Sequence, residues 1–100
     1  MSQPCIIAAN WKMNYGPKTT IEYLERFYAL LDQTPKIRAS KHIQLLIFPP
    51  AISLWPAQQF ILGKPRLSLA LGCQHIHWKA QGAFTGEISS TMLKEAEVNW

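Results

Sequence analysis

The stretch that decides the fold is residues 6–14, which read IIAANWKMN. Its first four residues are apolar, as in a buried strand, and they run without a Gly or Pro break into Asn10, Trp11 and Lys12. In α/β domains, ligands bind in the crevice beyond the carboxyl ends of the parallel strands. The polar end of this predicted strand is therefore a candidate binding site, and Lys12 carries its charge.

A helix is predicted after this strand, beginning at Thr19. Gly16 and Pro17 form a turn, and Thr19 with Glu22 three residues later has the form of a capping box. Apolar side chains then recur at helical spacing, at Ile21, Leu24, Phe27, Tyr28 and Leu31. We expect this stripe to face the core, and Pro35 to end the first unit before a basic loop.

A second strand and a second helix are predicted next. Ile43–Phe48, IQLLIF, is a short apolar run stopped by two prolines, and we expect a strand buried on both faces. A helix is predicted over Ala51–Leu62, with Gly63 and Pro65 closing it. Proline lacks an amide hydrogen, so Pro56 would be tolerated only in the first turn of this helix.

The third unit is predicted from the last apolar run, residues 67–73, which reads as a strand. A loop of small residues with Phe84 at its centre follows over residues 81–86, and Ser89 can cap a short helix. Val98 and Trp100 have the character of the first residues of a fourth strand.

The alternation of apolar strands and helices predicts repeated βα units around a parallel sheet. An eight-unit barrel of about 250 residues would contain this chain as its first three units and a little more. An open sheet of three strands would leave apolar edges that promote aggregation. We therefore expect an α/β fold in which residues 1–100 are part of a single (β/α)8 barrel domain, cut short after the start of the fourth strand.

The charge pattern does not favour a nucleic-acid partner. The formal net charge is +4, and the one basic cluster comprises Lys36, Arg38, Lys41 and His42. Because no aromatic or glycine residues interleave it, we interpret the cluster as a solvated helix end and loop. A mildly basic chain would also attract a small anionic substrate.

The cysteines and the N-terminus favour a cytoplasmic protein. Cys5 and Cys73 lie inside apolar runs, as expected of reduced, buried thiols. The first residues, MSQPC, lack the pattern of a secretory signal, and prolines interrupt the longest apolar stretch before it could span a membrane.

Several segments in this order resemble one enzyme family, triosephosphate isomerase, over essentially the whole chain. They are ANWKMN at residues 9–14, FPPA at 48–51, GCQ at 72–74 and GAFTGE at 82–87, followed by Ser89, Met92, Leu93 and Lys94. The resemblance implies a (β/α)8 barrel that acts as a homodimer. It also implies interconversion of dihydroxyacetone phosphate and D-glyceraldehyde 3-phosphate through an enediolate, without a cofactor or a metal.

The resemblance assigns catalytic and substrate-binding roles to Asn10 and Lys12, which match the Asn-Trp-Lys motif of the family. The ammonium of Lys12 would stabilise negative charge on the substrate oxygen and phosphate, and the amide of Asn10 would donate a hydrogen bond to the substrate oxygen. The family's glutamate base and neutral histidine belong to motifs that this chain lacks, and the histidine is expected just after Trp100. The 100-residue chain alone is therefore expected to be inactive.

Residues 81–87 resemble the dimerisation loop of the family, which inserts beside the Asn and Lys of the partner subunit. The residues assigned to this interface are Gln74, Phe84, Thr85, Gly86 and Glu87. Thr85 would reach the neighbouring site, and Glu87 would order the loop by accepting backbone hydrogen bonds. An ordinary surface turn is the alternative, but an aromatic at the tip of a Gly-rich loop needs a place to be buried.

Two other functions remain open. In a fully extended chain, Cys73, His75 and His77 would present three metal ligands on one side. The family uses no metal there, and it carries an amide where His75 stands, so the local hydrogen bonding is expected to differ. Alternatively, the chain acts only in self-association through its third loop and its sheet edges. The expected partners remain a small phosphorylated triose and a second copy of the chain.

Overall fold

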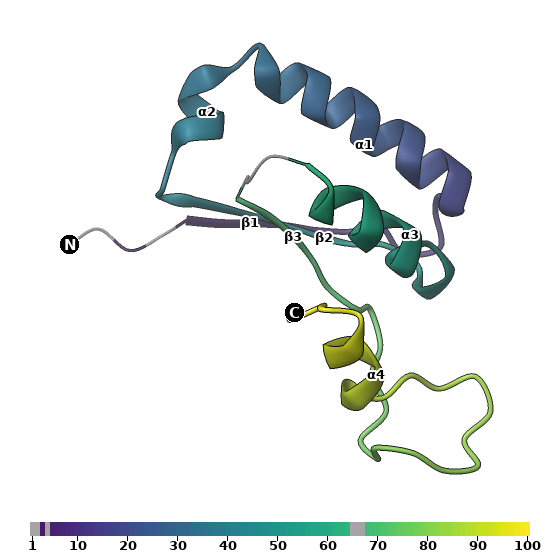
Figure 1. The fold of residues 1–100 in the computed structure, drawn as a ribbon. Coiled ribbons are helices and arrows are strands. Elements are labelled where there is room, and N and C mark those ends of the chain that lie inside the picture. Colours follow the sequence, from purple (N-terminus) through teal and green to yellow (C-terminus); the bar gives the residue numbers. More distant parts are fainter. Residues whose placement is uncertain (1–2, 4, 65–67) are drawn as a thin grey trace.

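The computed structural model describes residue 3, residues 5–64 and residues 68–100. Helices α1 and α3 lie on the same side of a three-stranded sheet, and a long loop with α4 extends beyond β3 (Figure 1). The elements are β1 (Cys5–Asn10), α1 (Pro17–Asp32), α2 (Pro35–Ala39), β2 (Ile43–Phe48), α3 (Ala51–Leu62), β3 (Leu69–Leu71) and α4 (Ser90–Glu95). No helix among these residues is long and apolar enough to cross a membrane.

The sheet is parallel throughout and has the order β1-β2-β3. Asn10 pairs with Phe48 at the end of β1, and Ile47 pairs with Leu71 at the end of β3. The carboxyl ends of all three strands therefore lie at one edge of the sheet, which confirms the predicted βα units and places the residues after β1 at the edge where α/β domains bind ligands.

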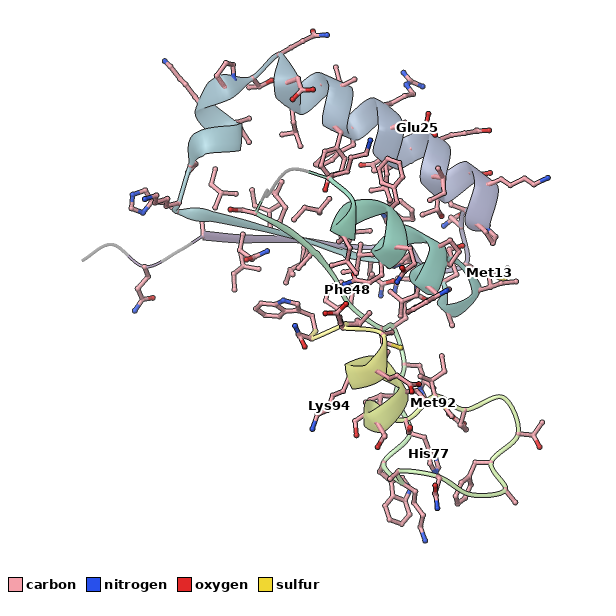
Figure 2. All side chains as sticks on the ribbon, viewed as in Figure 1. Met13, Glu25, Phe48, His77, Met92 and Lys94 are labelled. Atoms are coloured by element: carbon pink, nitrogen blue, oxygen red, sulfur yellow. The ribbon has the colours of Figure 1, made fainter. Side chains whose placement is uncertain are left out.

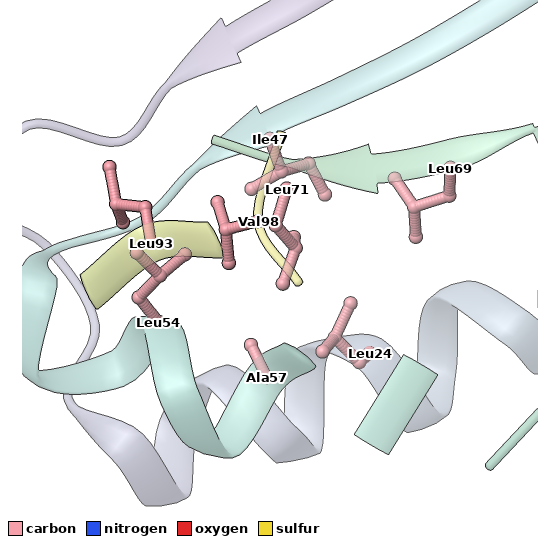
Figure 3. Packing of buried hydrophobic residues seen from close by; sticks show 8 residues of the cluster. All are labelled: Leu24, Ile47, Leu54, Ala57, Leu69, Leu71, Leu93 and Val98. Carbon is pink, nitrogen blue, oxygen red and sulfur yellow. The ribbon is translucent and has the colours of Figure 1, made fainter. Parts of the chain in front are cut away.

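The core lies between the sheet and the helices, where eight buried apolar residues pack together (Figure 3): Leu24, Ile47, Leu54, Ala57, Leu69, Leu71, Leu93 and Val98. The predicted stripe of α1 is confirmed, because Leu24 and Leu31 are buried and the other three members are half-buried. Each large aliphatic side chain removed from water in this way contributes about 1.5–3 kcal/mol.

The predicted start of the first helix was wrong. α1 begins at Pro17, its N-cap is Gly16, and no side chain caps it, so the predicted capping box does not form. Proline suits the first helical position because its φ is already helical and its missing amide hydrogen would be unpaired there. The predicted basic loop is also partly helical, since Pro35 begins the short α2. Lys36 and Lys41 are exposed, as expected for a solvated cluster.

The bounds of α3 match the prediction, and Gly63 is its C-cap residue. Pro56 is the sixth residue of this helix, however, and so lies beyond the first turn. A proline there removes the hydrogen bond that would run to the carbonyl of Ile52. Ile52 is 72 % exposed and Trp55 is 55 % exposed, so this part of α3 has a side that faces water.

The opening strand was predicted to be buried, and it is exposed along its whole length. β1 is an edge strand with a neighbour on one side only, which leaves Ile6 and Ile7 each 54 % exposed. Cys5 is exposed for the same reason, contrary to prediction, while Cys73 is half-buried; both are free thiols. By contrast, the two consecutive residues at the centre of β2, Leu46 and Ile47, are buried on opposite faces as predicted.

The third strand is shorter than predicted. Within residues 67–73, the strand comprises Leu69–Leu71, and Leu67 lies outside the described residues. The chain leaves the sheet at Gly72, where a Cβ atom would lie 2.2 Å from Cε2 of Phe48. The close approach of this ring requires a glycine.

The last helix is confirmed, but the fourth strand is not. The Ser89 hydroxyl accepts a hydrogen bond from the Met92 amide at 3.3 Å and so caps α4. Residues 98–100 are not in strand conformation. The Cys73 amide nevertheless donates to the Trp100 carbonyl at 3.1 Å, so the chain returns alongside the end of β3.

Candidate active site

The turn after β1 holds Lys12 in a conformation that few residues other than glycine adopt. Its φ is +56°, in the left-handed region. The Lys12 amide donates to Oδ1 of Asn10 at 2.8 Å, and Nδ2 of Asn14 donates to the Trp11 carbonyl at 2.7 Å. Such strain persists only where surrounding contacts hold it, and it is common at functional sites. Residues 10–14 are hereafter called the lysine turn.

Gln74 connects the lysine turn to the ends of the other two strands. Its Nε2 donates to the Lys12 carbonyl at 2.9 Å and to the Phe48 carbonyl at 2.7 Å. The same Phe48 carbonyl accepts the Trp11 amide at 3.1 Å. Gln74 itself follows β3, so one side-chain amide joins groups at the carboxyl ends of β1, β2 and β3.

Aromatic side chains pack against the lysine turn through Trp11. The ring of Trp11 packs edge-on against Tyr15 at 5.0 Å and against Tyr23 at 4.8 Å between centroids. The hydroxyl of the buried Ser53 donates to the Tyr15 carbonyl at 2.8 Å, and Tyr15 also has a positive φ of 73°. Sequence reasoning missed this support, although Tyr15 and Tyr23 stand close to the motif in the chain.

The two predicted site side chains present hydrogen-bond donors to solvent. Oδ1 of Asn10 already accepts the Lys12 amide, so Nδ2 is the part of the Asn10 side chain left to donate. Lys12 is exposed and adds an ammonium group, while Met13 beside it is 94 % exposed (Figure 2). An amide donor and a cation held on one rigid turn can stabilise negative charge that develops on a bound oxygen or phosphate.

The third loop, residues 81–87, extends away from the sheet (Figure 1). Phe84 packs against His77 with 4.2 Å between ring centroids, and it lies so close to Gly82 that a Cβ there would be 2.6 Å from Cε2 of the ring. Phe84 is nevertheless 40 % exposed, and Thr85 and Gly86 beside it are exposed. The loop is present as predicted, but its own chain buries its aromatic residue only in part.

Glu87 orders the loop differently from the prediction. Its Oε2 lies 2.5 Å from Nε2 of His75, and the described contacts of this carboxylate do not include backbone amides. The imidazole of His75 provides the carboxylate with a partner from outside the loop. The contact between His75 and Glu87 therefore joins the segment before the loop to the last residue of the loop.

The predicted metal ligands do not converge. The chain bends after Gly72, so that the Cys73 thiol donates to the His75 carbonyl at 2.6 Å while the His75 ring faces Glu87. Nε2 of His77 is buried without a hydrogen-bond partner. Among the residues described, no three His, Cys, Asp or Glu side chains come together to hold a metal ion. The structure therefore does not favour the metal-binding alternative.

Comparison with known proteins identifies the family. The family model described as triosephosphate isomerase matches residues 5–100. A triosephosphate isomerase of Prochlorococcus marinus (strain NATL1A) is 40 % identical over 93 residues, which are 93 % of this chain and 36 % of the relative. That of Aquifex aeolicus (strain VF5) is 42 % identical over 90 residues, which are 90 % of this chain and 33 % of the relative.

A solved structure gives the same result. The crystal structure of triosephosphate isomerase from Bartonella henselae matches with a TM-score of 0.73 and 32 % sequence identity, and the match covers 97 % of this chain and 35 % of that one. The chain spans about a third of the length of these relatives. The matches do not favour the self-association or metal-binding alternatives. The chain belongs to the triosephosphate isomerase family, and its three strands and their helices are part of a (β/α)8 barrel.

Proposed function

We propose that this chain is the N-terminal third of a triosephosphate isomerase, which interconverts dihydroxyacetone phosphate and D-glyceraldehyde 3-phosphate. Within the whole enzyme, Lys12 and Asn10 would bind the substrate and stabilise the transition state. The observation that carries the proposal is the lysine turn, which presents an ammonium and an amide donor at the carboxyl end of β1. It does so in a chain that matches the family model from residue 5 onward.

The chemistry of the reaction explains why a held cation is useful. Removing a proton next to a carbonyl produces an enediolate, in which negative charge moves onto oxygen. Donors that are already in place stabilise that charge without any reorganisation at the moment of reaction. The strained backbone of Lys12 and its hydrogen bond to Asn10 are such an arrangement. They fix the backbone from which the ammonium side chain extends before the substrate binds.

We propose that the family's glutamate base and its neutral histidine lie outside these 100 residues. The chain would then contribute charge stabilisation and substrate binding, while the group that moves the proton comes from later βα units. The 100-residue chain by itself is expected to have no isomerase activity. As a member of a glycolytic enzyme family, the whole protein is expected in the cytoplasm, and no cofactor is needed for this proton transfer.

We also propose that the third loop joins two copies of the enzyme. Phe84 in the loop is 40 % exposed and Trp78, shortly before it, is 82 % exposed, and exposed aromatic groups on a protruding segment favour burial against a second protein surface. In a symmetric dimer, each loop would enter the same pocket on its partner. Thr85 would then reach the lysine turn of the partner subunit.

A chimera tests the enzymatic proposal. Residues 1–100 would be joined to the remaining two thirds of the Aquifex aeolicus relative, and the isomerisation of both triose phosphates would be measured. We expect enzyme-like turnover from the chimera and none from the 100-residue chain. A chimera that is folded by circular dichroism but inactive would contradict the proposal, and turnover by the 100-residue chain would contradict the assignment of the base.

Sizing of the chimera over a range of concentrations tests the dimer. A specific dimer reaches a constant mass, whereas pairing through open strand edges continues to grow. Replacing Phe84 and Thr85 with serine and glycine should shift the chimera towards monomer. A dimer of unchanged affinity in this variant would remove the loop from the interface.

A further inference from the structure

We infer that Gln74 is a positioning residue for Lys12: its side-chain amide holds the left-handed turn from which the ammonium reaches the substrate. This inference rests on the proposed role of Lys12. Gln74 lies 62 residues further along the chain, yet its Nε2 donates to the Lys12 carbonyl at 2.9 Å. This role is separate from the interface role that the resemblance implies for Gln74.

The backbone of Lys12 is held on both sides of its Cα atom. On the amino side, its N–H donates to Oδ1 of Asn10 at 2.8 Å. On the carbonyl side, its oxygen accepts from Gln74. A lysine at φ +56° would relax to a more common conformation if either peptide group could turn. The two hydrogen bonds oppose rotation about the two bonds that define this conformation.

Gln74 also connects the lysine turn to a rigid reference, the end of the central strand. Its second hydrogen bond runs to the Phe48 carbonyl at 2.7 Å, and the Trp11 amide donates to the same oxygen. Phe48 ends β2, which pairs with β1 on one side and β3 on the other. The position of the Lys12 carbonyl is therefore set relative to the sheet, and not only relative to its own turn.

The chemistry of the amide explains why glutamine suits this position. A neutral Nε2 carries two hydrogens, and both are used on carbonyl oxygens of the same chain. A glutamate would turn a carboxylate towards two acceptors and repel them, and a methionine of similar length would leave both oxygens without this donor. Because both donors are used within the chain, only Oε1 of Gln74 is left for contact with a partner.

Amide hydrogen exchange in the 100-residue chain tests the positioning itself. In Gln74→Met, we expect exchange at the Lys12 and Trp11 amides to become at least about tenfold faster, because their turn loosens locally. The Gly72 amide, which donates to Ile47 inside the sheet, is the internal reference and should be unchanged. Gln59→Met, at an exposed glutamine of α3, is the matched control and should change neither amide.

Unchanged exchange at Lys12 in Gln74→Met would overturn the inference. If Gly72 also exchanges faster, Gln74→Met has unfolded the sheet, and Gln74→Asn, which keeps the amide but shortens its reach by one methylene, takes its place with the same criteria. These readings need no enzyme activity, so they stand or fall independently of the proposed function.

The chimera tests whether positioning matters to the reaction. We expect Gln74→Met to lower kcat by about 10- to 100-fold, a usual consequence of a slightly misplaced catalytic group, and to raise KM by less than kcat falls. If Gln74 acts through Lys12, then adding Gln74→Met to Lys12→Ala should cause no further loss. If the double variant instead loses a further factor of about 10 to 100 in kcat, Gln74 acts independently of Lys12. A loss of dimer affinity in Gln74→Met with unchanged exchange at the Lys12 amide would likewise show that Gln74 acts elsewhere.

Discussion

The lysine turn and the third loop both lie beyond the carboxyl ends of strands, but the chain holds them in different ways. Hydrogen bonds connect the lysine turn to Phe48 at the end of β2 and to Gln74, which follows β3. The third loop is held at its base, where the His77 amide donates to the Ile88 carbonyl at 2.8 Å and His75 contacts Glu87, and Phe84 packs against His77. The difference teaches that this chain alone preorganises the backbone that carries the Lys12 ammonium. In the third loop, by contrast, Phe84 stays 40 % exposed.

The largest effect is expected from removing the ammonium of the lysine turn. In the chimera, Lys12→Ala should lower kcat by about 100- to 1,000-fold, the loss seen when one preorganised donor to a developing oxyanion is removed. Lys18→Ala, at an exposed lysine in the first turn of α1, is the control and should keep kcat within a few-fold. Steady-state kinetics measure both variants, and near-normal activity of Lys12→Ala would remove this lysine from the mechanism.

The next effect should come from disturbing the packing between Gly72 and Phe48 at the ends of β3 and β2. Gly72→Ala places a Cβ 2.2 Å from the Phe48 ring and should lower the free energy of unfolding by about 1–3 kcal/mol, as for other overpacked sites. Gly16→Ala is the matched control, because nothing lies within 4 Å of its Cβ position. Urea unfolding of both variants gives the comparison, and equal midpoints would show that the ring yields without strain.

A smaller effect is expected at the base of the third loop. The side chains of His75 and Glu87 are 71 % and 34 % exposed, so Glu87→Gln should change the global free energy of unfolding by less than about 1 kcal/mol. Limited proteolysis should nevertheless cut residues 81–87 faster than in the parent. Glu95→Gln, at an exposed site on α4, is the control. Unaltered cleavage in Glu87→Gln would mean that the pair does not hold the loop.

The smallest effect is expected at Tyr28, on α1, whose ring packs against Phe60 of α3. Burial raises the pKa of the Tyr28 hydroxyl above its ordinary value of 10.0. The folded chain therefore keeps this proton to higher pH than the unfolded chain, so the stability that Tyr28 contributes is complete below about pH 10 and is lost as pH rises through the folded pKa. Tyr28→Phe should lose less stability between about pH 7 and about pH 11. Urea unfolding at each pH measures the free energy of unfolding of the parent and of Tyr28→Phe. Equal losses of stability in the two proteins would contradict the prediction.

Local patterns predicted the elements whose signals are local. β2 and α3 have the predicted bounds because apolar runs of the right length are punctuated by Pro49, Pro50 and Gly63. The start of α1 was missed because two adjacent signals compete, and Pro17 begins the helix before Thr19 can cap it. The exposure of β1 was missed because burial depends on neighbouring strands, which the residues of β1 do not specify.

The candidate site also divides into residues with a local sequence signal and contacts that depend on the folded sheet. Asn10 and Lys12 could be proposed from the sequence because they stand together in one short motif at a strand end. The contacts of Gln74 were not found, because the partners are 62 and 26 residues away and only the folded sheet brings them within reach. The partner of Glu87 was missed for a similar reason, since the pair spans 12 residues across a loop whose path no local pattern defines.

The order of the sheet has a consequence for how the chain is made. Strands that are neighbours in the sheet are also neighbours in the sequence, so each strand leaving the ribosome meets a partner that has already emerged. The sheet can grow by one strand at a time at the free side of β3, with α1 and α3 closing over each addition. The free side of β1 stays an open edge until another strand of the barrel pairs with it, and an open edge can pair with other chains during synthesis.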